Sequence, residues 1–225
     1  MNIAVLGTGM VGQALAGRLH ELGHDVVVGT RDPEATLART EPDGMGNPPF
    51  GAWLDAHRGV GLDTFAAAAG RAELVVNATS GGGALPALEA AGADALAGKV
   101  VLDISNPLDF SNGFPPTLFV KDTDSLGEQI QRAFPQARVV KSLNTLNATL
   151  MVDPASLGEE STVFVSGDDA EAKATVTELL HAFGHTDVID LGDLSTARGT
   201  EMLLPVWLRL MGALGTASFN FKVVR

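Results

Sequence analysis

The sequence predicts an α/β fold in which helices cover both faces of a doubly wound, parallel sheet. Short, continuously apolar runs alternate with helical stretches along the chain, and such continuous hydrophobicity is typical of strands buried on both faces. A glycine-rich turn directly follows the first apolar run, which lets a strand turn tightly into a helix. Apolar residues make up 45% of the chain and charged residues 19%, a balance that can fill a core and excludes a disordered chain.

Six strands are expected in the first two thirds of the chain, at 2–6, 25–29, 59–62, 73–78, 99–104 and 138–142. Helical stretches lie between several of them, at 10–22, 64–70, 84–97 and 124–134. Parallel strands need such crossovers, because each strand must start again at the same end of the sheet. Six strands with these crossovers form the predicted doubly wound sheet.

The α/β pattern continues beyond residue 150. A strand at 162–166, a helix at 169–183, a strand at 187–191 and a long apolar helix near 194–214 are expected there. We therefore divide the chain into a first domain, residues 1–150, and a small C-terminal α/β portion, residues 151–225. In the last helix, Arg198 and Glu201 are expected to form a helix-internal charge pair that serves packing or a dimer contact.

Residues 40–58 interrupt the pattern with a high density of glycine and proline. We expect a loop followed by a short helix, with Phe50 and Trp53 as its apolar anchors. Two interpretations remain open: a surface insertion held by the two aromatic residues, or a flap that covers a ligand.

The charge and composition narrow the classes of function. The formal net charge is −12, which disfavours broad binding to nucleic acid or to an anionic membrane surface. The chain has no cysteine, so disulfides and thiolate chemistry are excluded, and we expect no metal site. No stretch approaches the ~20 apolar residues of a membrane span. The N-terminus leads directly into an apolar strand, so a cytoplasmic protein is expected.

The glycine-rich turn has the form G-x-G-x-x-G, between a strand and a helix, which is the context of the Rossmann dinucleotide-binding fold. The first glycine permits the turn, the second lets a pyrophosphate approach the backbone, and the third lets the helix pack on the strand. The helix N-terminus adds free amides for the phosphates. The predicted cofactor-binding residues of this turn are Gly7, Thr8, Gly9, Met10, Val11 and Gly12.

The residues after the second strand predict NADP(H) rather than NAD(H). A carboxylate that binds the adenosine ribose usually lies about 20 residues past the last glycine, and Thr30 lies 18 residues past Gly12. A hydroxyl at Thr30 can donate to a 2′-phosphate, and Arg31 can bind it with charge-assisted hydrogen bonds. Asp32 opposes this reading, but Pro33 suggests that Asp32 caps the next turn. The alternative is that Arg31 pairs with Asp32 or Glu34 at the surface.

Three loops are expected at the crevice beyond the carboxyl ends of the strands. They are 77–83, 105–108 and 142–147. Carbonyl reduction needs a proton donor at this edge, but the chain has no tyrosine and its five histidines lie elsewhere. Lys141 is the one candidate donor, and we expect no side-chain acid or base in catalysis. Hydride transfer to an acceptor that needs no enzymic acid fits this composition.

The chain resembles the NADP-dependent oxidoreductases of the deazaflavin coenzyme F420. The resemblance rests on "VLGTGMVGQALAGRLHELGHDVVVGTRD", which many dinucleotide-binding proteins share. It rests more specifically on "VVKSLNTLNATLMVDP", "VFVSGDDAEAKATVTELL" and "DLGDLSTARGTEMLLPVWLRLMGALG". The family implies NADP(H) as cofactor, coenzyme F420 as co-substrate, direct hydride transfer between stacked rings, and a homodimer.

The resemblance also assigns residues. Its glycine loop and 2′-phosphate contacts coincide with Gly7 to Val11 and with Thr30 and Arg31. Its nicotinamide-side loop corresponds to Thr79, Ser80 and Gly81. Its acceptor-binding segment corresponds to Asn144, Thr145 and Leu146.

This chain departs from the family in its acceptor region. Asn144 and Asn147 stand where family members often carry a histidine and a proline, and the loops at 40–58 and 112–116 add to the family core. Two other functions therefore remain open. One is an NADPH-dependent reductase of another acceptor, such as a flavin or a ferric chelate. The other is a non-catalytic NADPH-binding sensor.

Overall fold

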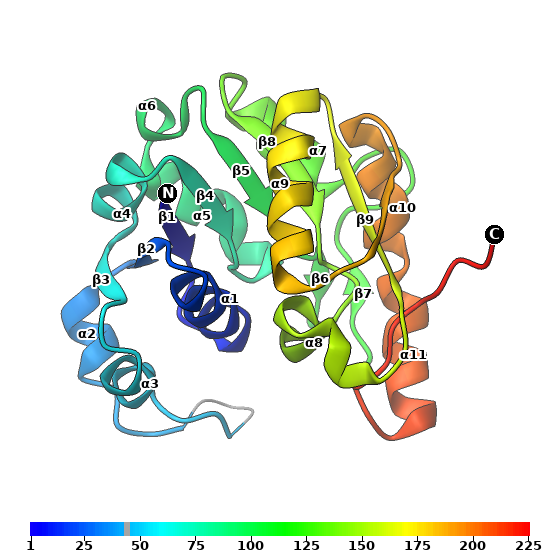
Figure 1. Ribbon diagram of the computed structural model, residues 1–225, viewed down its shortest axis with the longest axis horizontal. Helices are drawn as coiled ribbons and strands as arrows, with labels where there is room; N and C mark the ends of the chain where they lie inside the picture. Colours follow the sequence, from blue (N-terminus) through cyan, green and yellow to red (C-terminus); the bar gives the residue numbers. More distant parts are fainter. Residues whose placement is uncertain (43–45) are drawn as a thin grey trace.

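A computed structural model describes residues 1–42 and 46–225. Within them the chain forms one eight-stranded sheet with strand order β10-β9-β8-β5-β4-β1-β2-β3 (Figure 1). Its strands are β1 (Asn2–Leu6), β2 (Asp25–Thr30), β3 (Gly61–Thr64), β4 (Leu74–Asn77), β5 (Val100–Asp103), β8 (Arg138–Ser142), β9 (Thr162–Gly167) and β10 (Asp187–Asp190). The order of the first six is that of a Rossmann sheet, so the predicted fold class is confirmed.

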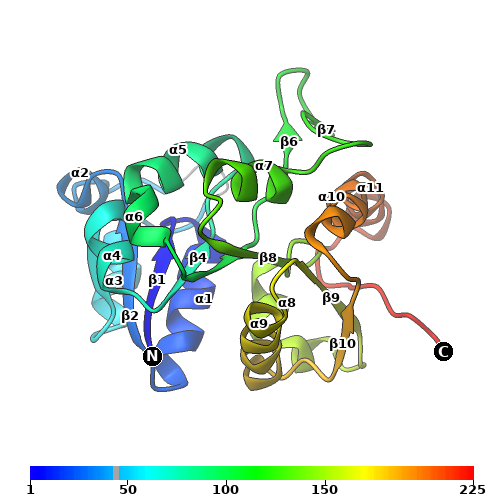
Figure 2. The ribbon, with the colours of Figure 1, turned by 90° about the horizontal axis from the view of Figure 1, so that it is seen from above.

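Helices cover both faces of the sheet, as Figure 2 shows from above. The helices are α1 (Met10–Glu21), α2 (Pro33–Leu37), α3 (Phe50–Ala56), α4 (Phe65–Arg71), α5 (Gly81–Ala91), α6 (Ala93–Leu96), α7 (Leu126–Ala133), α8 (Ala148–Val152), α9 (Ala170–Phe183), α10 (Ala197–Met202) and α11 (Leu204–Leu214). Alternate residues of β1 enter the two cores. Ile3 and Val5 pack on the face covered by α1, α3, α8 and α9. Ala4 and Leu6 pack on the face covered by α4 to α7.

Several predicted elements differ from the structure. β9 pairs antiparallel with β8, so the sheet is not parallel throughout, although β9 and β10 are parallel to each other. The predicted helix at 194–214 is divided into a short 3-10 turn, α10 and α11. Pro205 stands in the first turn of α11, and it has no N–H to continue the hydrogen bonding of α10.

A small hairpin after β5 was not predicted. β6 (Leu108–Asp109) and β7 (Thr117–Leu118) pair antiparallel, and they lie beside α11 in Figure 2. Leu108 and Leu118 pack on a third apolar cluster around Trp207 of α11. The hairpin and α11 therefore stabilise each other outside the two main cores.

The segment 40–58 contains α3, which agrees with the expected short helix. Phe50 is buried and its ring lies 5.3 Å from that of Trp53, measured between centroids. Residues 43–45 of this segment lie outside the described residues. Among the residues that the structure describes, no helix is both long and apolar enough to span a lipid bilayer.

Candidate functional site at the carboxyl edge of the sheet

The glycine-rich turn joins the carboxyl end of β1 to α1 and has the geometry of a phosphate-binding loop. Gly7 has a φ of 123°, a value that strongly favours glycine. A Cβ added at Gly12 would lie 2.0 Å from the carbonyl oxygen of Gly7, whereas a Cβ at Gly9 would meet no atom within 4 Å. Gly12 thus lets the helix pack against the turn, and Gly9 leaves open space where a pyrophosphate can approach.

The end of β2 carries the expected pair. Arg31 is exposed, and no ion pair of Arg31 occurs in residues 1–42 and 46–225, so it does not pair with Asp32 or Glu34. Asp32 instead caps α2, because its Oδ1 accepts a hydrogen bond of 2.9 Å from the amide of Ala35. The guanidinium of Arg31 is therefore available to a ligand.

Thr30 is less available than Arg31, because it is buried and its Oγ1 lies 2.9 Å from the Oγ1 of Thr36. Thr36 donates its own hydroxyl proton to the carbonyl oxygen of Asp32, at 2.7 Å. Since each hydroxyl carries one proton, Thr30 must be the donor to Thr36. A 2′-phosphate that takes a proton from Thr30 would have to replace Thr36 as its acceptor.

The loop after β4 lies against the loop after β5. A Cβ added at Gly81 would lie 2.0 Å from the carbonyl oxygen of Asn106, so the two backbones meet at a distance that excludes any side chain. Thr79 is half-buried, and its hydroxyl donates to Oδ1 of Asn77 at 2.7 Å. Ser80 is exposed and makes no capping bond at the start of α5.

The segment after β8 is more buried than a surface loop. Asn144 and Thr145 are each 3% exposed, and Leu146 is 6% exposed and belongs to the core. The amide group of Asn144 donates to Oδ1 of Asn106 at 3.0 Å and to the carbonyl oxygen of Thr200 at 3.1 Å. The segment is thus held in place between the β5 loop and α10.

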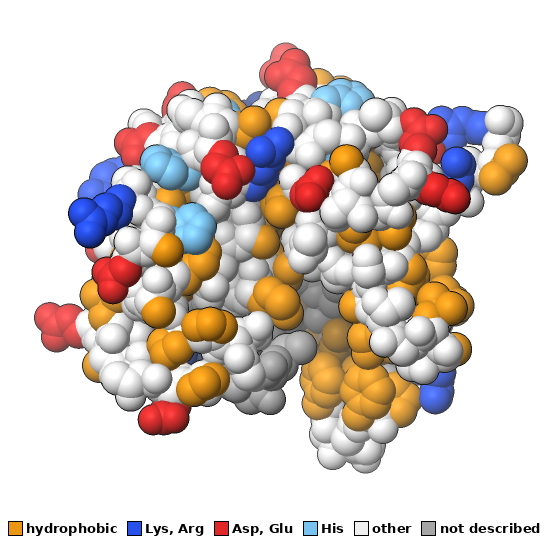
Figure 3. Space-filling model, turned by 60° about the horizontal axis from the view of Figure 1, so that its bottom comes forward, with side chains coloured by type: hydrophobic (Ala, Val, Ile, Leu, Met, Phe, Trp, Pro, Cys, Tyr) orange, Lys and Arg blue, Asp and Glu red, His pale blue; other side chains and the backbone are white. Residues whose placement is uncertain are grey.

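The strand order brings these loops to one edge, because β1, β2, β4, β5 and β8 are mutually parallel. Figure 3 views the molecule with this edge turned forward and shows a hollow bordered by apolar side chains. A pocket of about 360 Å³ also lies beside α1, between Trp53, His57 and Asp153. It contains none of the predicted site residues, and it was not expected from the sequence.

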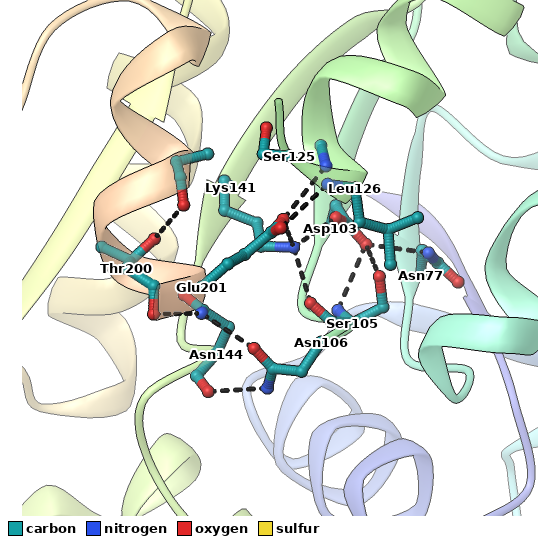
Figure 4. Close-up of polar contacts among 12 residues, drawn as sticks. Asn77, Asp103, Ser105, Asn106, Ser125, Leu126, Lys141, Asn144, Thr200 and Glu201 are labelled. Carbon is teal, nitrogen blue, oxygen red and sulfur yellow. Dashed lines mark hydrogen bonds and ion pairs between the residues drawn. The ribbon is translucent and has the colours of Figure 1, made fainter. Parts of the chain in front are cut away.

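A buried ionic cluster lies directly behind the edge (Figure 4). The ammonium of Lys141 contacts Oδ2 of Asp103 at 2.7 Å, the carbonyl oxygen of Ser105 at 2.6 Å and Oε1 of Glu201 at 2.8 Å. The three N–H bonds of the ammonium are thereby used. Glu201 also accepts hydrogen bonds from the backbone amides of Leu126 and Gly127, at 2.8 and 3.1 Å.

The cluster removes Lys141 from the possible proton donors. Burial by itself would lower the pKa of Lys141, but the carboxylates of Asp103 and Glu201 outweigh it and raise the pKa above its ordinary value. The ammonium is fully buried and its donors are occupied. It is a structural cation and not an acid that reaches a substrate.

The cluster also corrects the expected Arg198–Glu201 pair. Arg198 binds Glu128 of α7, with its Nε at 2.8 Å from Oε2, while Glu201 points to Lys141. The two residues of α10 thus make separate contacts with other elements. A charged residue within an apolar strand, such as Lys141 in β8, was the sequence signal for such a long-range pair.

Three of the five histidines have hydrogen-bond contacts with backbone carbonyl groups. Nδ1 of His57 lies 2.7 Å from the carbonyl oxygen of Trp53, and its ring stacks on the Trp53 ring. His181 and the buried His185 contact the carbonyl oxygens of His185 and Met151, respectively. In the described residues there is no group of three or more metal-binding side chains.

Comparisons with known proteins point to one family. The family described as NADP oxidoreductase, coenzyme F420-dependent, matches residues 2–107. A crystal structure of a candidate F420-dependent NADP reductase from Arthrobacter sp. FB24 is 64% identical, covers 100% of both chains and has a TM-score of 0.97. The F420-dependent NADP reductase of Methanothermobacter marburgensis is 28% identical over 214 residues, which are 93% of this chain and 92% of that enzyme.

A further relative is a much longer protein. Metalloreductase STEAP3 of Rattus norvegicus is 30% identical over 211 residues, which are 92% of this chain but 38% of STEAP3. This chain therefore spans less than half of STEAP3, whereas it spans the whole of the Arthrobacter protein. The likeness along the full chain, at 64% identity, decides the assignment. The chain belongs to the family of coenzyme F420-dependent NADP oxidoreductases, a class of NADP-dependent oxidoreductase.

Proposed function

We propose that the protein transfers a hydride between NADP(H) and a deazaflavin of the coenzyme F420 type, with the two rings stacked at the carboxyl edge of the sheet. The observation that carries this proposal is the 64% identity over the whole chain to the candidate F420-dependent NADP reductase of Arthrobacter sp. FB24. The 28% identity to the Methanothermobacter marburgensis enzyme supports the same reaction.

The chemistry of the edge supports direct hydride transfer. The loops after β4, β5 and β8 offer hydroxyl, amide and backbone groups, and the nearby Lys141 is fully engaged by its three acceptors. Hydride transfer between two rings needs proximity and the exclusion of water rather than a proton donor. The reacting chemistry belongs to the two coenzymes, and the protein positions them.

Each predicted site residue has a proposed role. The turn from Gly7 to Gly12 binds the pyrophosphate through backbone amides, and the open space at Gly9 fits this group. Arg31 binds the 2′-phosphate, while Thr30 orders the loop or exchanges its bond to Thr36 for one to the phosphate. The loop from Thr79 to Gly81 lies along the nicotinamide, and the segment from Asn144 to Leu146 lies on the acceptor side.

A second candidate reaction is the reduction of a ferric chelate or a flavin by NADPH. The 30% identity to a metalloreductase over 92% of this chain favours it.

We also propose a homodimer. Phe110, Phe114 and Phe119 at the β6–β7 hairpin are 58%, 65% and 47% exposed, and exposed apolar side chains are often covered by another subunit.

The experiment offers coenzyme F420, FMN and a ferric chelate in turn to the purified protein and monitors NADPH absorbance. Fast oxidation of NADPH with F420 alone is the expected result. Faster oxidation with FMN or the ferric chelate would replace the first reaction by the second. A protein that binds NADPH but oxidises it with none of the three would overturn both reactions.

A further inference from the structure

A chain of hydrogen bonds leads from Lys141 to the loop proposed to hold the nicotinamide, and Figure 4 shows its buried part as far as Asn77. Oδ2 of Asp103 accepts from Lys141 at 2.7 Å, and Oδ1 of Asp103 accepts from Nδ2 of Asn77 at 2.8 Å. Oδ1 of Asn77 in turn accepts from the hydroxyl of Thr79 at 2.7 Å. Asp103 and Asn77 are 0% exposed, so water does not compete for the bond between them.

The direction of these bonds fixes what Thr79 can offer. A carboxylate only accepts, so Asn77 must turn its NH₂ group toward Asp103 and its oxygen toward Thr79. The single proton of the Thr79 hydroxyl is then donated to Oδ1 of Asn77. The remaining lone pairs of Thr79 can only accept a hydrogen bond from a ligand. The carboxamide of a nicotinamide carries two N–H donors, which match this acceptor.

A second branch leads from Lys141 to the acceptor side. Lys141 donates to the carbonyl oxygen of Ser105, at 2.6 Å, which fixes the loop that contains Asn106. Asn106 and Asn144 exchange hydrogen bonds: Nδ2 of Asn106 donates to the carbonyl oxygen of Asn144 at 2.8 Å, and Nδ2 of Asn144 donates back at 3.0 Å. The ammonium of Lys141 is therefore connected by hydrogen bonds to both the proposed nicotinamide side and the proposed acceptor side of the site.

We propose that Lys141 is a positioning residue for hydride transfer, which acts through Asp103 and Asn77 to present Thr79 to the nicotinamide carboxamide as a pure hydrogen-bond acceptor. This inference rests on the proposed binding of the nicotinamide at the Thr79 loop. Lys141 would thus act indirectly, because its buried ammonium contacts neither ring. The orientation of the carboxamide sets the orientation of the ring that carries the hydride, and small misplacements of reacting groups slow a reaction strongly.

The test is a double-mutant cycle between Asn77→Leu and Thr79→Val. Asn77→Leu removes the relay at nearly constant size. It leaves the pairs of Lys141 with Asp103 and Glu201 in place, and Oδ1 of Asp103 keeps its bonds from Ser105, so the fold is expected to be retained. Each variant is expected to slow single-turnover hydride transfer, Thr79→Val by about tenfold, while the Kd of NADPH changes less than about twofold. Because the relay acts through Thr79, the double variant is expected to be no slower than Thr79→Val. Multiplicative effects would overturn the proposal.

Lys141→Met tests the origin of the relay, and Lys173→Met is its control. Lys173 also forms an ion pair, at 2.9 Å with Asp190, and its side chain is 14% exposed, but none of its bonds leads to Thr79. Lys141→Met is expected to slow hydride transfer at least as much as Asn77→Leu, and Lys173→Met to leave it unchanged. Equal slowing by both lysine variants would indicate a general loss of structure and overturn the inference.

The readout separates this inference from the proposed function. If another acceptor replaces F420, the cycle is measured with that acceptor, and coupling between positions 77 and 79 still supports the relay. If no acceptor oxidises NADPH, the fluorescence lifetime of bound NADPH reports the mobility of its ring. A shorter lifetime in Asn77→Leu and Thr79→Val supports the relay, and unchanged lifetimes in both overturn it.

Discussion

The Nζ atom of Lys141 lies 2.8 Å from Oε1 of Glu201, and both residues are fully buried. They come from β8 and α10, which are 60 residues apart in the sequence. Glu201 also binds the first free amides of α7, at Leu126 and Gly127, where the positive end of the helix favours a carboxylate. One side chain thus joins the C-terminal segment to the nucleotide-binding sheet.

Replacement of Glu201 by alanine is expected to destabilise the fold by about 3–5 kcal/mol, because it breaks a buried ion pair and leaves two helix amides without a partner. Urea unfolding followed by circular dichroism measures this loss. The control is Arg71→Ala, which removes an ion pair between Asp63 and an arginine side chain that is 62% exposed. That loss is expected to stay below about 1 kcal/mol, and equal losses in the two variants would contradict the special role of burial.

Arg31→Ala is expected to weaken NADPH binding by roughly 1.5–3 kcal/mol, the scale of a hydrogen bond to a charged group, and to leave NADH binding nearly unchanged. The guanidinium is exposed and free of ion pairs within the described residues, so its removal should not disturb the fold. Titration of both coenzymes by fluorescence measures the difference. Equal losses of affinity for NADPH and NADH would show that Arg31 does not bind the 2′-phosphate.

Gly81→Ala and Gly82→Ala form a matched pair in the first turn of α5. A methyl group at Gly81 would lie 2.0 Å from the carbonyl oxygen of Asn106, whereas one at Gly82 would meet no atom within 4 Å. Gly82→Ala is therefore expected to stabilise the protein by about 0.5–1 kcal/mol through helix propensity. Gly81→Ala should separate the two loops and lower both stability and hydride transfer. Thermal unfolding and NADPH oxidation of the two variants check this, and similar behaviour would refute the close approach.

Asp124 provides a test at acid pH. Its hydrogen bonds with the Arg132 guanidinium, at 2.9 and 2.7 Å, hold the pKa of the carboxyl at about 2, below its ordinary value of 3.8. The lowered pKa means that this pair stabilises the fold above pH 3.8 and loses its effect as the pH falls toward 2. Asp124→Asn is therefore expected to be less stable than the wild type at pH 6, and most of this difference is expected to be lost at pH 2.

Urea unfolding at several pH values measures this difference. Since the Arg132 side chain is 60% exposed, 1 M salt should also reduce the difference at pH 6. A difference that persists unchanged at pH 2 would show that Asp124 stabilises the fold by another contact.

The sequence predicted the elements whose signal is local. Continuous apolar runs located the buried strands, and the spacing of Gly7, Gly9 and Gly12 located the turn into α1, because strand burial and tight turns leave marks within a few residues. The cap at Asp32 was also predicted and is confirmed by its bond to Ala35. The roles of the individual site residues stay predictions.

The features that were missed depend on contacts between distant segments. The Lys141 cluster joins β5, β8, α7 and α10. A local sequence pattern does not show which charged residues from distant segments form ion pairs. β9 runs antiparallel to β8. The direction of a buried strand does not change its pattern of apolar residues, so the sequence did not reveal it. The β6–β7 hairpin is short, and it is held by α11, more than 80 residues later in the sequence.

The continuous sheet has a consequence for how the protein can be shortened. β9 and β10 extend the sheet on the far side of β8, so a chain that stopped near residue 150 would present β8 as a bare edge with unpaired N–H and C=O groups. The same cut would remove α9 from its place over Val140. Such a fragment would expose the edge of the valine-rich strand β8 and is expected to aggregate, so biochemical work calls for a chain that includes β9 and β10.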